Sequence, residues 1–291
     1  MNMFSPAELA ENYAELGVKK TTAPVWKLFL LGALAGFLIG MAAAATNTAA
    51  HAITNISAVR IICGVLFPFG LAMVTLLGGE LFTGNCMIPI SILEGKTTIS
   101  GMLRNWACVY TGNFFGALLL AAGCAFFGQM NHSDGGLAAF TIGIAVLKCS
   151  FPFMNAIVLG ILCNLLVCIA VLCASSAKDT VGKIFGAYVP IAFFVLCGFE
   201  HSIANMYYIP AGLFAMRIPM YAAKAAELGV NAETLTWGNF FLKNLIPVTV
   251  GNIIGGVLIG LLIWACYLSQ KANKQRLHTG EMTVSQIMLT K

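Results

Sequence analysis

Charged side chains are scarce in this sequence. Only 9% of its 291 residues are Asp, Glu, Lys or Arg, and 59% are hydrophobic, whereas soluble domains carry about 25% charged residues. This composition excludes an ordinary soluble domain and predicts a protein that crosses the membrane several times. The net charge of +5 comes mostly from the ends and loops, so we expect no nucleic-acid partner.

The motifs of several enzyme and cofactor classes are also missing. No G-x-x-x-x-G-K-[ST] or G-x-G-x-x-G motif supports nucleotide use. The ten cysteines stand singly, without the spacing of a zinc site, and His201 is the only histidine deep in an apolar segment, so a pair of axial haem ligands is lacking. The sequence has no paired Asn-Pro-Ala motif, which argues against a water or glycerol channel. We therefore expect neither an enzyme nor a bound metal or cofactor.

Six apolar stretches are long enough to cross a bilayer, which takes about 20 residues. They cover residues 28–45, 59–93, 106–127, 153–174, 185–216 and 245–268. The second and fifth stretches exceed one straight crossing and contain internal glycine and proline. We predict that both are broken helices, because irregular backbone at membrane depth is tolerated where it is buried in protein or lines a cavity.

These stretches divide the chain into five parts. We predict an amphipathic surface helix at 1–25, a first three-helix unit at 26–128, a connecting loop at 129–152, a second three-helix unit at 153–268 and a mobile basic C-terminal tail at 269–291. Lys and Arg predominate in the loops on the side of the termini. The positive-inside rule then places both termini in the cytoplasm of a cell inner membrane or plasma membrane.

The two halves of the chain share a pattern. Arg104-Asn105 followed by Gly112-Asn113 in the first half matches Lys243-Asn244 followed by Gly251-Asn252 in the second. Each broken stretch also carries Glu, Asn and Ile-Pro in that order. Because each copy has three crossings, the second copy enters the membrane upside down. The fold predicted is an all-α membrane protein, an inverted three-plus-three repeat of aquaporin-like type, with helices 2 and 5 broken and the site near the midplane.

Ionisable side chains at membrane depth mark candidate functional residues. His201 can donate a hydrogen bond to an anion or give it a proton, since its unperturbed pKa is near 6.5; the alternative is a packing residue bonded to Glu200 or to a backbone carbonyl. Glu80 and Glu200 occupy corresponding places in the two breaks. We expect freed backbone N–H groups to bind both carboxylates, which gives them a structural role shared with Asn85 and Asn205.

Other residues at membrane depth allow two interpretations each. Neutral polar groups make hydrogen bonds between helices or line a narrow path: Thr83, Asn164, Ser202 and Asn205. Apolar groups form ordinary core or a hydrophobic constriction: Phe67, Leu71, Leu81, Val167 and Phe194. Lys148 either places its charge at the membrane surface or attracts anions at a pore mouth.

Three motifs resemble the formate/nitrite transporter family over residues 5–268: G-E-L-F-T-G-N, G-F-E-H-S-I-A-N-M-Y-Y-I-P and K-N-L-I-P-V-T-V-G-N-I-I-G-G. The resemblance implies an aquaporin-like homopentamer with one pore per subunit. It also makes His201 the central pore residue, with Thr83 and Asn164 near it, and Lys148 a vestibule lysine. The two constrictions would hold Phe67, Leu71 and Leu81 on one side and Phe194 with Val167 on the other.

The function that this resemblance implies is passage of small monovalent anions of weak acids across the lipid bilayer. A passive channel is the first interpretation, and a proton-coupled symporter of the same anions is the alternative; they differ in whether a pH gradient drives uphill accumulation. Overall resemblance favours the hydrosulfide branch of the family, with formate and then nitrite behind it.

Overall fold

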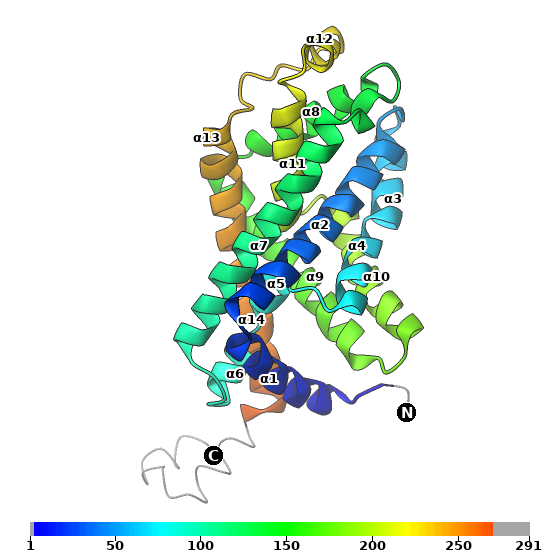
Figure 1. Ribbon diagram of the computed structural model, residues 1–291. Coiled ribbons are helices and arrows are strands. Elements are labelled where there is room, and N and C mark those ends of the chain that lie inside the picture. The colour runs from blue at the N-terminus through cyan, green and yellow to red at the C-terminus, as the bar shows by residue number, and fades with distance from the viewer. Residues whose placement is uncertain (1–2, 270–291) are drawn as a thin grey trace, which may run out of the picture.

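The computed structural model describes residues 3–269, and this part of the chain is folded as helices joined by short connections (Figure 1). Six helical segments are long and apolar enough to cross a membrane, which confirms the predicted all-α class. They are Val25–Ala50 (α2), Ile56–Leu77 (α3 and α4), Ile99–Phe126 (α7), Phe153–Ser176 (α9), Thr180–Cys197 (α10) and Trp237–Tyr267 (α13, η2 and α14). The predicted C-terminal tail, from residue 270 onward, lies outside the described residues.

Both predicted breaks are present, and each begins at a glycine with positive φ. In the first half, α3 (Ile56–Leu66) is followed directly by α4 (Pro68–Leu77), which ends at Gly78 (φ 69°), and α5 (Phe82–Asn85) and α6 (Pro89–Leu93) come next. In the second half, α10 ends at Gly198 (φ 73°) and α11 (Ser202–Ala215) follows. Glycine ends a helix this way because it lacks the Cβ that penalises the left-handed conformation.

The two halves run in opposite directions through the bundle. Helix α2 begins beside α1 (Pro6–Thr22), whereas α9 ends beside it (Figure 1). The backbone amide of Phe4, just before α1, donates to the carbonyl of Ser176 at the end of α9, at 2.8 Å. Close approach of glycines repeats as well: a Cβ on Gly116 would collide with the backbone of Ala33, and one on Gly251 with that of Ile157. Small residues let α2 pack on α7 and α9 on α14 (Ile246–Tyr267) at short range.

The segment predicted as a connecting loop, residues 129–152, contains a helix. Helix α8 (Gly136–Cys149) buries Ala138, Ile142 and Ala145 against α11, where Gly212 leaves room for Ala145. Its 14 residues rise about 21 Å, too little for a hydrocarbon layer of about 30 Å, so a search for full crossings passes over it. The other short helical segments within residues 3–269 are η1 (Gln129–Asn131), α12 (Pro219–Glu227), α13 (Trp237–Asn239) and the π-helix η2 (Phe240–Leu245).

Candidate functional site

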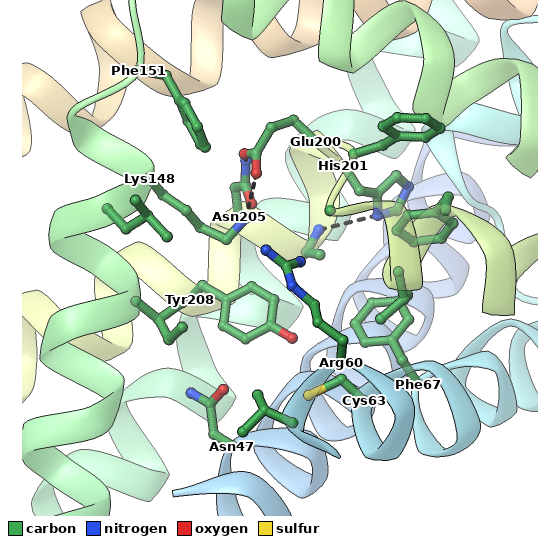
Figure 2. A pocket seen from close by; sticks show the side chains of 18 of the residues that line it. Asn47, Arg60, Cys63, Phe67, Lys148, Phe151, Glu200, His201, Asn205 and Tyr208 are labelled. Atoms are coloured by element: carbon green, nitrogen blue, oxygen red, sulfur yellow. Dashed lines mark hydrogen bonds and ion pairs between the residues drawn. The ribbon is translucent and has the colours of Figure 1, made fainter. Parts of the chain in front are cut away.

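A cavity of about 270 Å³ lies in the half of the bundle away from α1, between α3, α8, the end of α10 and α11 (Figures 1 and 2). Aromatic side chains form much of its wall, including Phe67, Phe140, Phe151, Phe194 and Phe199. Its polar lining comes from Asn47, Arg60, Lys148, Glu200, His201, Asn205 and Tyr208. Such a mainly apolar cavity with a few convergent polar groups is the usual form of a small-molecule site.

His201 joins the two broken helices at the inner end of this cavity. It is the N-cap residue of α11 and only 3% exposed. Its Nδ1 accepts the backbone N–H of Ala204 at 3.3 Å, so the neutral ring carries its hydrogen on Nε2. From Nε2 it donates to Thr83 Oγ1 of α5, at 3.0 Å. A residue of the second half thus meets one of the first half at a single point.

Two phenylalanine rings lie in the cavity wall beside His201. The rings of Phe67 and Phe194 pack edge to face with centroids 5.7 Å apart, and Phe194 lies 5.9 Å from the His201 ring. The predicted grouping, which set Phe67 and Phe194 on opposite sides, is therefore wrong, because an edge-to-face aromatic contact holds them together. The remaining predicted constriction residues are buried in the same core but do not line the cavity: Leu71, Leu81 and Val167.

Both glutamates of the breaks form ion pairs with a lysine from a preceding short helix. Lys20 Nζ of α1 lies 2.9 Å from the Glu80 carboxylate, and Lys148 Nζ of α8 lies 2.8 Å from Glu200 Oε1. Asparagine side chains donate to both carboxylates as well: Asn85 to Glu80 and Asn205 to Glu200, each at 2.7 Å. The expectation that freed backbone N–H groups bind these carboxylates is wrong, and sequence reasoning missed Lys20.

The freed backbone groups bind two other asparagines, which sequence reasoning matched in the repeat but gave no role. Asn113 of α7 and Asn252 of α14 each accept one N–H from the break of their own half and donate to two carbonyls. For Asn113 the partners are Phe82 N (3.0 Å), Gly32 O (2.8 Å) and Glu80 O (2.9 Å), and for Asn252 they are Ser202 N (2.9 Å), Gly160 O (2.8 Å) and Glu200 O (3.0 Å). The repeated Gly-Asn pairs are the signal that points to them.

Asn164 of α9 lies behind the histidine–threonine pair. Its amide nitrogen donates to the carbonyls of Thr83, at 3.1 Å, and Asn252. Its Oδ1 is buried and has no hydrogen-bond partner among the described residues. Asn164 therefore ties α5 to α14 and holds the backbone that presents Thr83.

Chemically, the part of the site around His201 and Thr83 offers neutral hydrogen-bond donors within an apolar wall. Over residues 3–269 no group of three or more His, Cys, Asp or Glu side chains lies close enough to hold a metal ion. The buried charges of Glu80 and Glu200 are balanced by lysines. Such an arrangement can stabilise a small anion without holding it through a full ion pair.

Comparison with known proteins gives one consistent family. The profile described as "Formate/nitrite transporter" matches residues 7–265. A "Probable formate transporter" of Methanothermobacter thermautotrophicus is 36% identical over 91% of this chain and 98% of its own, and "Formate channel FocA" of Escherichia coli K12 is 35% identical over 92% and 96%. A solved "Pentameric formate channel with formate bound" has TM-score 0.72 and 36% identity, covering 84% of this chain and 98% of its own. An "FNT family ion channel" has TM-score 0.74 and 25% identity, with 90% and 98% covered.

Proposed function

This chain belongs to the formate/nitrite transporter family, and we propose that it is a channel for small monovalent anions of weak acids, with formate as the first candidate. It is a multi-pass membrane transport protein and not an enzyme. We propose further that five copies assemble with one pore in each, because the related formate channel is pentameric. Both termini would face the cytoplasm, in agreement with the distribution of Lys and Arg.

Formate takes precedence over hydrosulfide and nitrite because three of the four relatives described above are named as formate transporters or channels. The preference for hydrosulfide, which rested on overall resemblance alone, finds no support in these names and is dropped. The word channel in them also favours passive flow over the proton-coupled symporter.

The observation that carries the proposal is the contact between His201 and Thr83 in the middle of the bundle. An ion at the centre of a bilayer costs about 3 kcal/mol or more. When an anion arrives, Nε2–H of His201 would donate to it in place of the threonine oxygen, and the Thr83 hydroxyl would donate a second hydrogen bond. Formate accepts such bonds strongly because its charge lies on two oxygens.

Whether His201 also gives up a proton depends on its other ring nitrogen. Nδ1 accepts the Ala204 N–H, and a second hydrogen placed there would face another hydrogen. This contact favours hydrogen bonding over proton transfer as the way in which the ring stabilises the anion. Chloride would cross poorly in either case, because it neither takes a proton nor accepts hydrogen bonds as strongly as a carboxylate.

The apolar residues around this contact would keep water from surrounding the anion. We propose that Phe67 and Phe194 form the constriction on the side of the cavity. Leu71, Leu81 and Val167, which are buried in the same core but do not line the cavity, would form the second constriction; this departs from the grouping that the family resemblance implies. Asn164 and the residues of both ion pairs, Lys20 with Glu80 and Lys148 with Glu200, would keep the two breaks in place.

Anion flux into proteoliposomes tests the proposal. The reconstituted protein is compared with blank liposomes for formate, hydrosulfide, nitrite and chloride, and with His201→Ala that elutes as wild type in size-exclusion chromatography. Rapid flux of formate with little chloride, reduced at least tenfold in His201→Ala, is expected, since one hydrogen bond to a charged group contributes about 1.5–3 kcal/mol. Formate flux in His201→Ala equal to that of wild type, or rapid chloride flux that is the same in both, would make the histidine architectural, and uphill formate accumulation driven by a pH gradient would identify a symporter.

A further inference from the structure

Two cationic side chains line the cavity, and one of them is already neutralised. Lys148 Nζ lies 2.8 Å from Glu200 Oε1 and 5.2 Å above the centre of the Tyr208 ring. Its side chain is only 14% exposed. A cation held this close to a carboxylate attracts a distant anion weakly, because the two opposite charges nearly cancel at longer range. Lys148 is therefore poorly suited to attract anions.

Arg60 on α3 is the second cation. It is exposed, lines the same cavity and forms no ion pair or hydrogen bond within residues 3–269. The charged groups of the cavity wall are then Arg60, Lys148 and Glu200, and with the lysine and glutamate paired, the excess positive charge belongs to Arg60. A guanidinium keeps that charge at any physiological pH.

The position of Arg60 places its guanidinium at the start of the second break. Figure 2 shows the side chain reaching from α3 into the cavity, toward the segment that carries His201. Its Nη1 lies so close to Gly198 that a Cβ there would be only 2.6 Å away. Gly198 thus permits both the left-handed turn and the approach of the guanidinium. Two roles fit this position: attraction of the anion, and interaction with the carbonyl end of α10.

We propose that Arg60, rather than Lys148, attracts the permeating anion and forms its first binding site in the cavity. This inference rests on the proposed function, since it names the residue through which the anion enters. The planar guanidinium donates two parallel hydrogen bonds to a pair of oxygens. Formate and nitrite match that geometry, whereas hydrosulfide and chloride present a single atom. Arg60 would therefore favour two-oxygen anions before they reach His201.

Formate flux tests this site through its dependence on concentration and salt. Arg60→Gln should raise the formate concentration for half-maximal flux about five- to tenfold at 10 mM ionic strength, with the maximal rate unchanged. The difference should shrink toward twofold at 1 M salt, since the screening length falls from about 30 Å to 3 Å. Arg60→Lys should keep much of the attraction but lose part of the preference for formate over hydrosulfide.

Arg217→Gln provides the matched control, because Arg217 is exposed and does not line the cavity; it should leave both flux parameters unchanged. If Arg60→Gln leaves the half-maximal concentration unchanged at low salt, the proposal is overturned. If it lowers only the maximal rate together with the melting temperature, Arg60 supports the end of α10 and the proposal is likewise overturned.

Labelling of Cys63 measures the same charge without any transport. This thiol lines the cavity one helical turn after Arg60. The ratio of its labelling rates with anionic and cationic methanethiosulfonates, read by peptide mass spectrometry, should fall several-fold in Arg60→Gln. Exposed Cys173 is the internal reference. A wild-type protein without formate flux but with this Arg60-dependent ratio would refute the proposed channel and retain the anion site, whereas an unchanged ratio would refute the site.

Discussion

The two broken helices are supported by the same set of polar contacts, here called the frame, and differ in the residues that these contacts position. In each half a glutamate accepts hydrogen bonds from a lysine of a preceding short helix and from an asparagine five residues further on. That asparagine in turn donates to an asparagine of the third helix, Asn85 to Asn105 at 2.8 Å and Asn205 to Asn244 at 2.7 Å. Asn113 and Asn252, which bind the freed backbone groups of the two breaks, complete this frame. Matching partners at nearly equal distances indicate that the frame is a duplicated structural unit.

The residues that follow each glutamate are not duplicated. Leu81 follows Glu80, whereas His201 follows Glu200. Two positions further on, Thr83 of the first half corresponds to Ile203 of the second. The frame is constrained in both halves because each break leaves backbone groups that need partners. The side chains that follow each glutamate are not required in both halves as partners of these backbone groups and are free to differ. The second half therefore supplies the histidine and the first half the threonine.

Removing the asparagines of the frame should have the largest effect. Asn252→Leu leaves one N–H and two carbonyls at the second break without their partner, and Asn113→Leu does the same at the first. Each unsatisfied group costs about 1–3 kcal/mol, so both variants should lose most folded protein. The measurement is the monodisperse fraction after heating, in fluorescence-detected size-exclusion chromatography.

The control for this pair is Asn231→Leu. Asn231 is exposed and accepts a single backbone N–H within its own loop, so its variant should resemble wild type. Severe loss in one frame variant together with normal stability in the other would contradict the equivalence of the two frames.

Breaking the ion pairs should reveal a graded difference between the halves. Glu200→Gln strands Lys148, and Glu80→Gln strands Lys20. The loss of stability should approach about 3 kcal/mol at Glu200 and be smaller at Glu80, because the Glu200 side chain is 4% exposed and that of Glu80 is 13% exposed. Adding Lys148→Met or Lys20→Met should restore part of the melting temperature. Equal losses at both sites, or no rescue, would count against this ranking.

Local patterns were enough to predict the crossings and the breaks. Hydrophobic length marks each span, and the positions of Glu, Asn and Ile-Pro mark both interruptions. The partner of Glu80 could not be predicted in the same way, because Lys20 lies 60 residues away on a helix expected only at the membrane surface. An apolar helix too short to cross the bilayer, such as α8, escapes a test based on length.

Contacts within the site depend on packing between distant helices. His201 and Thr83 were both selected by their depth in apolar segments, but their bond spans 118 residues. The contact between Phe67 and Phe194 could not be predicted, because the sequence position of an apolar residue does not indicate which distant side chain it packs against. In the sequence, Arg60 has no pattern that distinguishes it from other charges near a membrane surface, because its place in the cavity depends on how α3 packs beside α10.

Thr83 provides a sharper test of the asymmetry. Thr83→Val keeps the shape of the side chain but removes the hydroxyl that contacts His201 and that would donate the second hydrogen bond to the anion, so formate flux should fall about tenfold, or 1.4 kcal/mol in barrier height. The melting temperature should change by only a few degrees, and Thr83→Ser should retain most of the flux. Val and Ser variants with the same flux would show that the hydroxyl plays no part in passage.

The smallest effect is expected at the start of α1, which carries Lys20 as α8 carries Lys148. Glu8 and Ser5 cap α1 reciprocally, with the Ser5 backbone N–H and hydroxyl each 2.8 Å from Glu8 Oε2. These two bonds, the backbone one first, hold the pKa of Glu8 below its ordinary value of 4.5. A carboxylate whose pKa is lowered in the folded state stabilises that state at pH values above the unfolded pKa. This contribution is lost as the pH falls through the folded pKa.

Amide exchange protection in the first turn of α1 should therefore decline somewhat below pH 4.5, a dependence that Glu8→Gln should abolish. Helix α8 has no side-chain cap and serves as the internal reference; protection in α1 that ignores pH in the wild type would refute the role of this cap.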